Sequence, residues 1–555
     1  MKDQGSQEIP SSQTVLWCDA DIGGLKDIGL GEGRLTEGQL KEVLRRYNLR
    51  DGLIVLGRAS NLVFNDKSIN SMGKAASRDP GTGVIVSQFG LAYLASALIS
   101  SGANDYKSKQ IGDKQNLLTL LNIYSNDLAS PELRRDPNAP LTHRDMAPLM
   151  VRMYAEQFEY QFNYVNLIAR NIIIYNEIIN LVPPQKFDAL NVIFEKETGL
   201  TFPDYFVLSF ATWAVSQKTA TFRKDVLYGS QIPTMQEALT DEKVTNFLNI
   251  LSVDYSTFRK EDLDANVNLD PVFTKYRFNP LLVYPIIKTD KEAIDPYVIP
   301  NTLAFLKKSF GGLYWWFHRH FEATGHQQDF RNYFGGVFEQ YVGRILKQAY
   351  GEKNVHPEIT YPKGKFVDWW VECNSTIYLF EAKAYQFALP TKQTGDNALL
   401  IKEVKTKIVQ SIEQVFNRMS EINNYSELAF FRDKKIVPVI VFLEIPLASG
   451  HLYRELIDDE LKELEAKGET GIRDAKIHLL NIEELELFDC AVNKIPLEDV
   501  FGKYEKNIAE GFLSVIQNEL GEPPRNKYLD KVFNDFMIQM TADKHYDRHE
   551  ASAEE

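Results

Sequence analysis

The sequence predicts an α/β fold in the C-terminal part of the chain, preceded by a large, mainly α-helical domain. Two observations lead to this prediction. Several long segments between residues 84 and 251 have apolar residues at helical spacing. From residue 330 onwards, helical and strand patterns follow each other in the order helix, hairpin strands, helix, strand, helix, strand. That order is typical of a sheet covered by helices on both faces, an α/β/α sandwich.

The composition is that of an ordinary globular protein with more than one domain. At 555 residues the chain is long for one hydrophobic core, so we expect two or three domains. The net charge of −14 excludes a surface that attracts nucleic acid as a whole, so phosphate binding must be local or metal-assisted. The three cysteines have no metal-ligand spacing, and no apolar run is long enough to cross a bilayer. We therefore expect a cytoplasmic protein that does not contact a membrane.

The first 80 residues form a segment of mixed character. Thr36 and Gln39 have the spacing of a capping box and predict the start of a helix. Asp51–Phe64 is rich in apolar and β-branched residues, and predicts one or two short strands. Asn65–Gly83 is polar and contains glycine, which indicates a loop.

Residues 81–270 predict a mainly helical domain whose role the sequence does not state. Prolines stand between the apolar segments, where helices would end. The tyrosines and phenylalanines near residue 160 recur at helical spacing, which favours a buried bundle face over a platform for nucleic-acid bases. Residues 271–329 predict a connector, which is rich in proline up to Pro300 and ends in an aromatic helix. The helical segments are Val84–Ser101, Gln115–Ser125, Arg144–Leu181, Phe187–Phe194, Phe202–Ser216 and Met235–Leu251, and the aromatic helix is Thr302–Phe321.

The most informative stretch is KGKFVDWWVECNSTIYLFEAKAY, residues 363–385. Two runs rich in aromatic and β-branched residues, 365–372 and 376–384, flank a short polar stretch. This pattern predicts a β-hairpin with its turn at Asn374-Ser375. It is preceded by an amphipathic helix over Phe330–Tyr350, which carries Glu339 at the edge of its apolar face.

In this hairpin two acidic residues face each other. The register places Asp368 opposite Glu381, with Cβ atoms roughly 5 Å apart, and two carboxylates so placed repel. Because side chains alternate along a strand, Lys383 shares a face with Glu381. A protein tolerates such a set when a cation lies between the acids, and a divalent metal is the usual candidate.

These residues resemble the hairpin of the PD-(D/E)XK nuclease superfamily. That hairpin carries an acid on one strand and an acid-x-Lys on the next, here Asp368 and Glu381-Ala382-Lys383. A preceding helix of the family usually supplies a further acid, and Glu339 fits this position. Asp368 follows Val367, where the family motif has proline. The resemblance covers roughly Phe330–Phe488 and implies an α/β/α restriction-endonuclease-like core at residues 330–490.

The resemblance implies a metal-dependent endonuclease. Asp368, Glu381 and the carbonyl of Ala382 would hold one or two Mg²⁺ or Mn²⁺ ions, and Glu339 would complete the metal site directly or through water. Lys383 is expected to stay protonated beside two carboxylates, which favours electrostatic stabilisation over general-base action. Many family members carry a functional glutamine on the next helix, and Gln410 fits by order, although a helical wheel turns it away from the apolar stripe. The implied catalytic residues are thus Asp368, Glu381, Lys383, Glu339 and Gln410.

The substrate implied by the resemblance is nucleic acid, with DNA favoured over RNA. A large helical domain joined to such a nuclease resembles bacterial restriction and phage-defence effectors, in which the extra domain senses or regulates. The helical half is also a candidate surface for a second copy of the chain or a partner protein. Three alternatives stay open: a catalytically silent nuclease fold that binds nucleic acid or a partner, a scaffold in which the helical half carries the function, and a charged edge hairpin with a solvated Glu–Lys pair.

The elements after the hairpin complete the predicted domain. The pattern predicts an amphipathic helix over Ala398–Ile422. Ile436–Ile445 is apolar almost throughout, as expected for a parallel strand buried on both faces. A helix over Leu452–Lys467 and a strand over Lys476–Leu480 follow. Residues 491–555 predict C-terminal helices and a frayed tail. The apolar stripe of the amphipathic helix consists of Ile401, Val404, Ile408, Ile412, Val415 and Met419.

Overall fold

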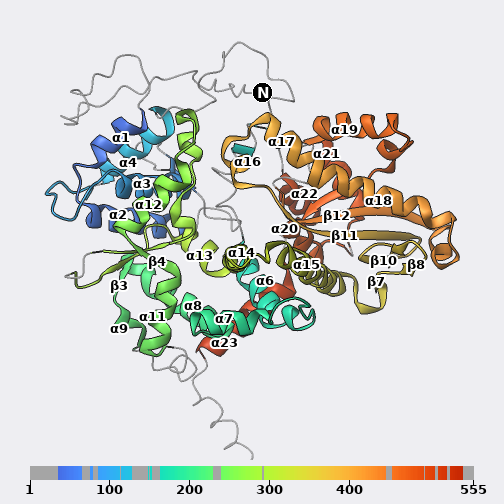
Figure 1. The fold of residues 1–555 in the computed structure, drawn as a ribbon, viewed down its shortest axis with the longest axis horizontal. Helices are drawn as coiled ribbons and strands as arrows, with labels where there is room; N and C mark the ends of the chain where they lie inside the picture. Colours follow the sequence, from blue (N-terminus) through green and yellow to red (C-terminus); the bar gives the residue numbers. More distant parts are fainter. Residues whose placement is uncertain are drawn as a thin grey trace, which may run out of the picture.

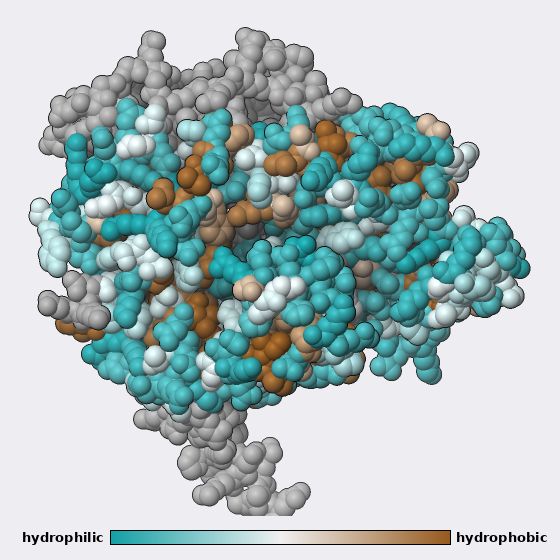
Figure 2. All heavy atoms as spheres, in the orientation of Figure 1, coloured by the Kyte–Doolittle hydropathy of each residue, from teal (hydrophilic) through white to brown (hydrophobic). Residues whose placement is uncertain are grey.

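The computed structural model combines helices and sheets, as predicted, with a helical half (residues 36–323) beside a sheet half (residues 327–520) (Figure 1). Most of the predicted loop Asn65–Gly83, much of the aromatic segment near residue 155 and the tail after residue 541 lie outside the described residues. None of the described helices is long and apolar enough to cross a membrane. Hydrophilic residues cover most of the face seen in Figure 2, and apolar residues gather in separate patches. The described residues are 36–65, 76–78, 85–112, 114–127, 148, 151–152, 163–228, 239–289, 293–445, 453–492, 494–506, 511–521 and 525–541.

The helical half is a set of packed helices with two small sheets. The predicted capping box is confirmed, because the Thr36 side chain accepts a hydrogen bond from the Gln39 amide and the Gln39 side chain accepts one from the Thr36 amide. A two-stranded sheet, β1 (Ala76–Arg78) and β2 (Ile85–Ser87), precedes the third helix. The helices are α1 (Glu37–Leu44), α2 (Leu49–Asn65), α3 (Gln88–Ser100), α4 (Lys114–Asn122), α6 (Tyr164–Asn176), α7 (Leu190–Thr198), α8 (Phe202–Thr219), α9 (Lys224–Tyr228), α11 (Asp241–Leu251), α12 (Tyr255–Asn266), α13 (Thr302–Gly311) and α14 (Leu313–Ala323).

Helix α2 corrects one prediction, because Asp51–Phe64 is helical and contains no strand. Leu49, Leu53 and Leu56 recur at helical spacing and are buried, as is Phe64. The burial of one continuous face therefore outweighs the strand propensity of the β-branched residues between them.

The predicted connector contributes strands to the helical half. A small sheet has the order β3-β6-β5-β4, and its strands β5 and β6 come from the connector. The domain boundaries at residues 81, 271, 330 and 491 stay predictions. Strands β5 and β6 of the connector are, however, hydrogen-bonded to β4 and β3 of the predicted helical domain. The strands are β3 (Thr221–Phe222), β4 (Ser252–Asp254), β5 (Ile286–Lys288) and β6 (Tyr297–Val298).

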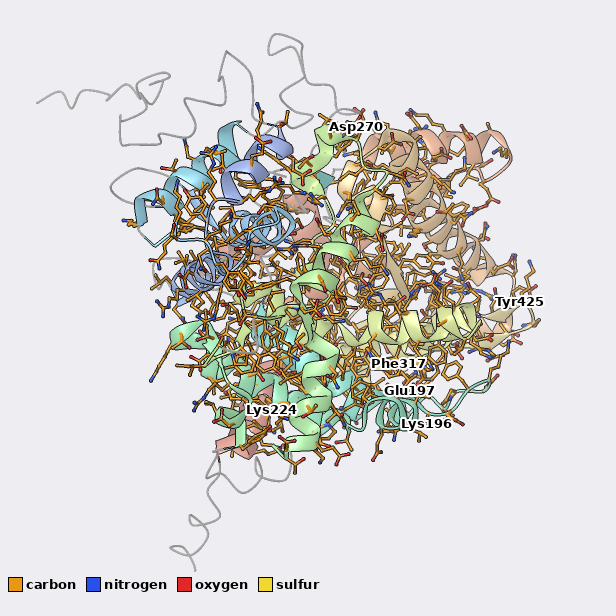
Figure 3. The ribbon with its side chains drawn as sticks, turned by 60° about the vertical axis from the view of Figure 1, so that its left-hand side comes forward. Lys196, Glu197, Lys224, Asp270, Phe317 and Tyr425 are labelled. Atoms are coloured by element: carbon orange, nitrogen blue, oxygen red, sulfur yellow. The ribbon has the colours of Figure 1, made fainter. Side chains whose placement is uncertain are left out.

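The predicted aromatic helix is two helices, α13 and α14, that meet at Gly312. A Cβ atom at Gly312 would lie 2.3 Å from the carbonyl oxygen of Lys308, so only glycine fits this junction. Phe317 on α14, labelled in Figure 3, is fully buried and contacts the rings of Tyr175 and Phe330. It thereby links the helical half to the first helix of the sheet half.

The sheet half is built on a five-stranded sheet with the order β13-β12-β11-β10-β7. Strands β7, β10 and β11 are antiparallel, whereas β11, β12 and β13 are parallel, so the apolar run in β12 is a parallel strand between two neighbours, as predicted. The bounds of its strands are β7 (Val355–Pro357), β10 (Trp369–Cys373), β11 (Thr376–Gln386), β12 (Lys435–Glu444) and β13 (His478–Asn481). A separate two-stranded sheet consists of β8 (Thr360–Tyr361) and β9 (Gly364–Lys365). The helices are α15 (Gln327–Tyr350), α16 (Leu389–Thr394), α17 (Asn397–Glu403), α18 (Gln410–Ser420), α19 (Arg454–Ala466), α20 (Ile482–Glu486), α21 (Leu497–Lys506) and α22 (Gly511–Leu520).

Helices cover both faces of this sheet (Figure 1). On one face, Trp369, Val371 and Phe380 share a core with Phe338 and Tyr341 of α15. The other face is covered by α18 and by the π-helical segment Val404–Val409 before it. The hairpin is therefore held between α15 and α18, and both helices reach its open end.

The two halves share buried contacts. Arg170 on α6 binds the carboxylate of Glu486 on α20 through two hydrogen bonds of 2.7 and 2.9 Å, and Tyr341 on α15 donates a third. The C-terminal helix α23 (Lys527–Thr541) packs on α6, with Phe533 against Tyr164. One hydrophobic core runs through both halves as a result.

Candidate active site

The observed hairpin has the register that the sequence predicts. Pairs run from Trp369↔Phe380 to Cys373↔Thr376, and Asn374 adopts the positive φ of a tight turn. Asp368 comes just before Trp369, and its Oδ2 accepts a hydrogen bond of 2.7 Å from the amide of Ala382. Asp368 and Glu381 are therefore brought together at the open end of the hairpin.

Asp368 lies in a site where negative charge accumulates. Burial raises the pKa of its carboxyl group to about 8, with further contributions from the charges of Glu381 and Glu339. The Ala382 amide and Lys383 oppose this shift, but they do not cancel it. The ionised form of Asp368 is thus costly unless additional positive charge arrives.

Glu339 approaches the same site from α15. Burial raises the pKa of its carboxyl group most, and the negative charge of Glu358 raises it further, whereas Lys365 opposes the shift. Trp369 fixes the helix here, because its indole N–H donates a 2.9 Å hydrogen bond to the Glu339 carbonyl. The Trp369 ring packs against Gly343, and a Cβ atom added at Gly343 would lie 2.2 Å from the ring. The structure therefore brings Glu339 close to Asp368 and Glu381, as predicted by order along the chain.

Glu381 is almost completely buried, with 2% of its surface exposed. Its Oε1 accepts a 2.7 Å hydrogen bond from Lys383 Nζ, which confirms that these two residues share a face. Its Oε2 accepts a 2.5 Å hydrogen bond from the guanidinium of Arg418 on α18. Both carboxylate oxygens are thus paired with a cation, as a buried carboxylate requires.

The glutamine that reaches the site is Gln414 and not the predicted Gln410. Gln414 Oε1 accepts a 2.7 Å hydrogen bond from Lys383 Nζ, whereas Gln410, one turn earlier, is exposed. Gln414 and Arg418 are four residues apart and share one face of α18. The sequence therefore predicts the correct helix and residue type, but the wrong turn of the helix.

The error has a structural cause. Gln410 and Gln414 both follow the π-helical turns at Val404–Val409, and one helical turn along α18 separates them, so the point on the helix axis that Lys383 reaches decides which glutamine it contacts. Of the predicted apolar stripe, Val404, Ile408, Ile412 and Val415 are buried, whereas Ile401 is exposed and its neighbour Leu400 is buried instead. The helix also lies between the sheet and α19, where Lys405 pairs with Glu460, so two of its faces are covered.

A basic hairpin borders the acidic residues. Strands β8 and β9 bring Lys365 near them; its ammonium binds Glu358 at 2.6 Å, and Asp368 and Glu339 also favour its charged form. The hairpin is anchored by Tyr361, whose ring packs on Tyr425 at 5.2 Å between centroids. Tyr425 lies at the outer edge of the sheet half (Figure 3).

The donor chemistry suits a hard divalent cation, but the side chains are not arranged around one. Carboxylate oxygens are the ligands that Mg²⁺ and Mn²⁺ prefer. Within the described part of the chain, however, no group of three or more His, Cys, Asp or Glu residues is arranged to hold a metal. The Lys383 ammonium and the Arg418 guanidinium bind the two carboxylate oxygens of Glu381, where a metal cation would bind. A cation could therefore bind here if Arg418 gave up its position.

Comparison with known proteins gives no match to a family model, to a curated protein or to a solved structure. The function must therefore be inferred from the site. The site consists of three acids, a lysine held by one of those acids and by a glutamine, and an arginine.

Proposed function

We propose that the chain is a metal-dependent endonuclease that hydrolyses phosphodiester bonds, with DNA favoured over RNA and the sheet half as a restriction-endonuclease-like core. The observation that carries this proposal is the position of Asp368 against the Ala382 amide, beside Glu381, with Lys383 on the same face. The raised pKa of Asp368 supports it, because a carboxyl group among other carboxylates becomes a good ligand once a cation offsets their repulsion.

In this proposal each residue has one task. Asp368, Glu381 and the Ala382 carbonyl would hold Mg²⁺ or Mn²⁺, and Glu339 would complete the site. A bound cation would lower the pKa of a coordinated water and offset charge on the phosphate. Lys383 would donate to the developing negative charge. Gln414 would keep the Lys383 ammonium in position, because it accepts a hydrogen bond from Nζ.

The helical half would have a sensing or regulatory role, as in bacterial restriction or phage-defence effectors. The contact of Arg170 and Tyr341 with Glu486, to which both donate hydrogen bonds, supports this role, because it joins α6 to the helix that carries Glu339. A nucleic acid, a second copy or a partner protein bound to the helical half could act on the site through this contact.

The second candidate function is a catalytically silent fold that binds nucleic acid or a partner. One observation favours it: both oxygens of Glu381 are already paired with cationic side chains. A cleavage assay on plasmid, linear DNA and RNA distinguishes the two candidates. The nuclease proposal predicts cleavage with Mg²⁺ or Mn²⁺ and none with EDTA. Binding without cleavage in either metal would favour the silent fold.

A further inference from the structure

The ion pair of Arg418 and Glu381 joins two side chains of unequal freedom. The Glu381 side chain is 3% exposed and belongs to β11, which is paired with a strand on each side. The Arg418 side chain is 20% exposed and extends from α18 through a long, flexible chain. If the pair separates, Arg418 is the partner that moves.

The Arg418 guanidinium is needed to neutralise Glu381 only while no other cation is present. A buried carboxylate that loses its partner is strongly unfavourable. Lys383 satisfies Oε1 of Glu381, and Arg418 satisfies Oε2. Among the hydrogen bonds of the described residues, Asp368 accepts one, from the Ala382 amide, and it has no cationic donor. A cation between Asp368 and Glu381 would therefore supply the positive charge that Asp368 lacks and would replace Arg418 at Oε2 of Glu381.

We infer that Arg418 exchanges partners: it pairs with Glu381 in the metal-free protein, and it binds a backbone phosphate of nucleic acid when a divalent cation shares the Glu381 carboxylate. This inference rests on the proposed function and assigns Arg418 as a phosphate-binding residue of the same site. The planar guanidinium suits the task, because it can donate two parallel hydrogen bonds to a phosphate.

The position of Arg418 on α18 supports this assignment. Arg418 lies one helical turn beyond Gln414, which is hydrogen-bonded to Lys383. The released guanidinium would therefore stay beside the residue proposed to stabilise the phosphate.

The test measures binding rather than cleavage, on the full chain with substitutions at Arg418. Arg418→Gln removes the charge and keeps a polar side chain, and Arg418→Lys keeps the charge but loses the planar fork. Mn²⁺ affinity is measured by titration calorimetry without nucleic acid. The affinity for a short fluorescent DNA duplex is measured in Ca²⁺, a cation of the same charge and ligand preference. Arg223→Gln is the control, because it removes an arginine–carboxylate pair with Asp225 in the helical half.

The exchange predicts opposite effects of Arg418→Gln on the two affinities. Mn²⁺ should bind roughly tenfold tighter or more, because no guanidinium competes, and the duplex should bind roughly tenfold weaker. Arg418→Lys should bind Mn²⁺ about as the parent does and the duplex more weakly, which keeps the test open if the glutamine variant folds poorly. Arg223→Gln should change neither affinity.

Two results overturn the inference alone. In the first, the parent binds Mn²⁺ and Arg418→Gln binds it no more tightly. In the second, Arg418→Gln binds the duplex with the affinity of the parent. Absence of Mn²⁺ binding by both the parent and Arg418→Gln overturns the proposed function as well. The two failures can therefore be told apart.

Discussion

The guanidinium of Arg418 donates to the carboxylate of Glu381, and this contact occupies the oxygen that a metal ligand would have to offer. Lys383 donates to the other oxygen. The site thus has the residue types of a metal-dependent hydrolase, in an arrangement that balances charge without a metal.

Replacing Lys383 should separate metal binding from catalysis. Lys383→Ala removes the cation on Oε1 of Glu381, so Mn²⁺ should bind as well as in the parent or more tightly. The cleavage rate should fall on the order of 100-fold, because a donor to the developing charge is lost. Calorimetry with Mn²⁺ and plasmid cleavage on the same preparation check this prediction. Loss of both properties together would mean that Lys383 has a structural role.

The two glutamines on α18 should differ in their effect on cleavage. Gln414→Ala removes a hydrogen bond that holds Lys383, and we expect cleavage to slow by about 10–100-fold. Gln410→Ala changes an exposed residue one turn earlier and should leave the rate close to that of the parent. Initial rates at saturating Mn²⁺ give the comparison. The reverse ranking would support Gln410 over Gln414 as the glutamine of the site.

The buried pair of Arg170 and Glu486 should contribute strongly to stability. Arg170→Met leaves the Glu486 carboxylate buried without its guanidinium, which should lower the free energy of unfolding by about 3–5 kcal/mol. Adding Glu486→Gln should recover part of that loss, since no unpaired charge remains. Urea denaturation monitors both variants. As a control, Arg344→Gln removes a half-exposed pair with Glu177 and should cost about 0–1 kcal/mol. Equal effects of Arg170→Met and Arg344→Gln would contradict the prediction.

His478 should make the folded protein sensitive to acid. Burial lowers the pKa of its imidazole from 6.5 to about 4, and the ring stacks on Phe501 at 4.2 Å. Between these two values the unfolded state binds a proton more readily than the folded state, so stability falls as the pH drops from about 6.5 to about 4. His478→Gln should remove this part of the pH dependence, while His326→Gln, at an exposed site, should not. Denaturation midpoints across this pH range provide the measurement. An identical slope for His478→Gln and the parent would show that His478 does not cause it.

The hairpin could be predicted because its information is local. The alternation of side chains and a short polar turn determine which residues face each other, so the pairing of Trp369 with Phe380 follows from the sequence alone. Lys383 beside Glu381 follows from the same alternation. The capping box at Thr36 is local as well.

Features that depend on distant contacts could not be predicted. A helical wheel shows on which side of α18 a residue lies but not which helical turn Lys383 and Glu381 reach, so it does not distinguish Gln414 from Gln410 or single out Arg418. The glutamine–arginine spacing of four residues was the available signal. Asp51–Phe64 folds as a helix because of the core that it meets. Arg170 and Glu486 are 316 residues apart, and no pattern along the chain indicates that they pair.

The most direct test of the central claim compares plasmid cleavage by the parent and by Asp368→Asn in Mn²⁺. Glu372→Gln is the matched control, because Glu372 is a carboxylate of the same hairpin that pairs with Lys434 outside the site. We predict that the parent and Glu372→Gln cut the plasmid, that EDTA stops both, and that Asp368→Asn is slower on the order of 100-fold or more. Cleavage by Asp368→Asn at the parent rate, or no cleavage by the parent in Mn²⁺, would contradict the proposed metal site.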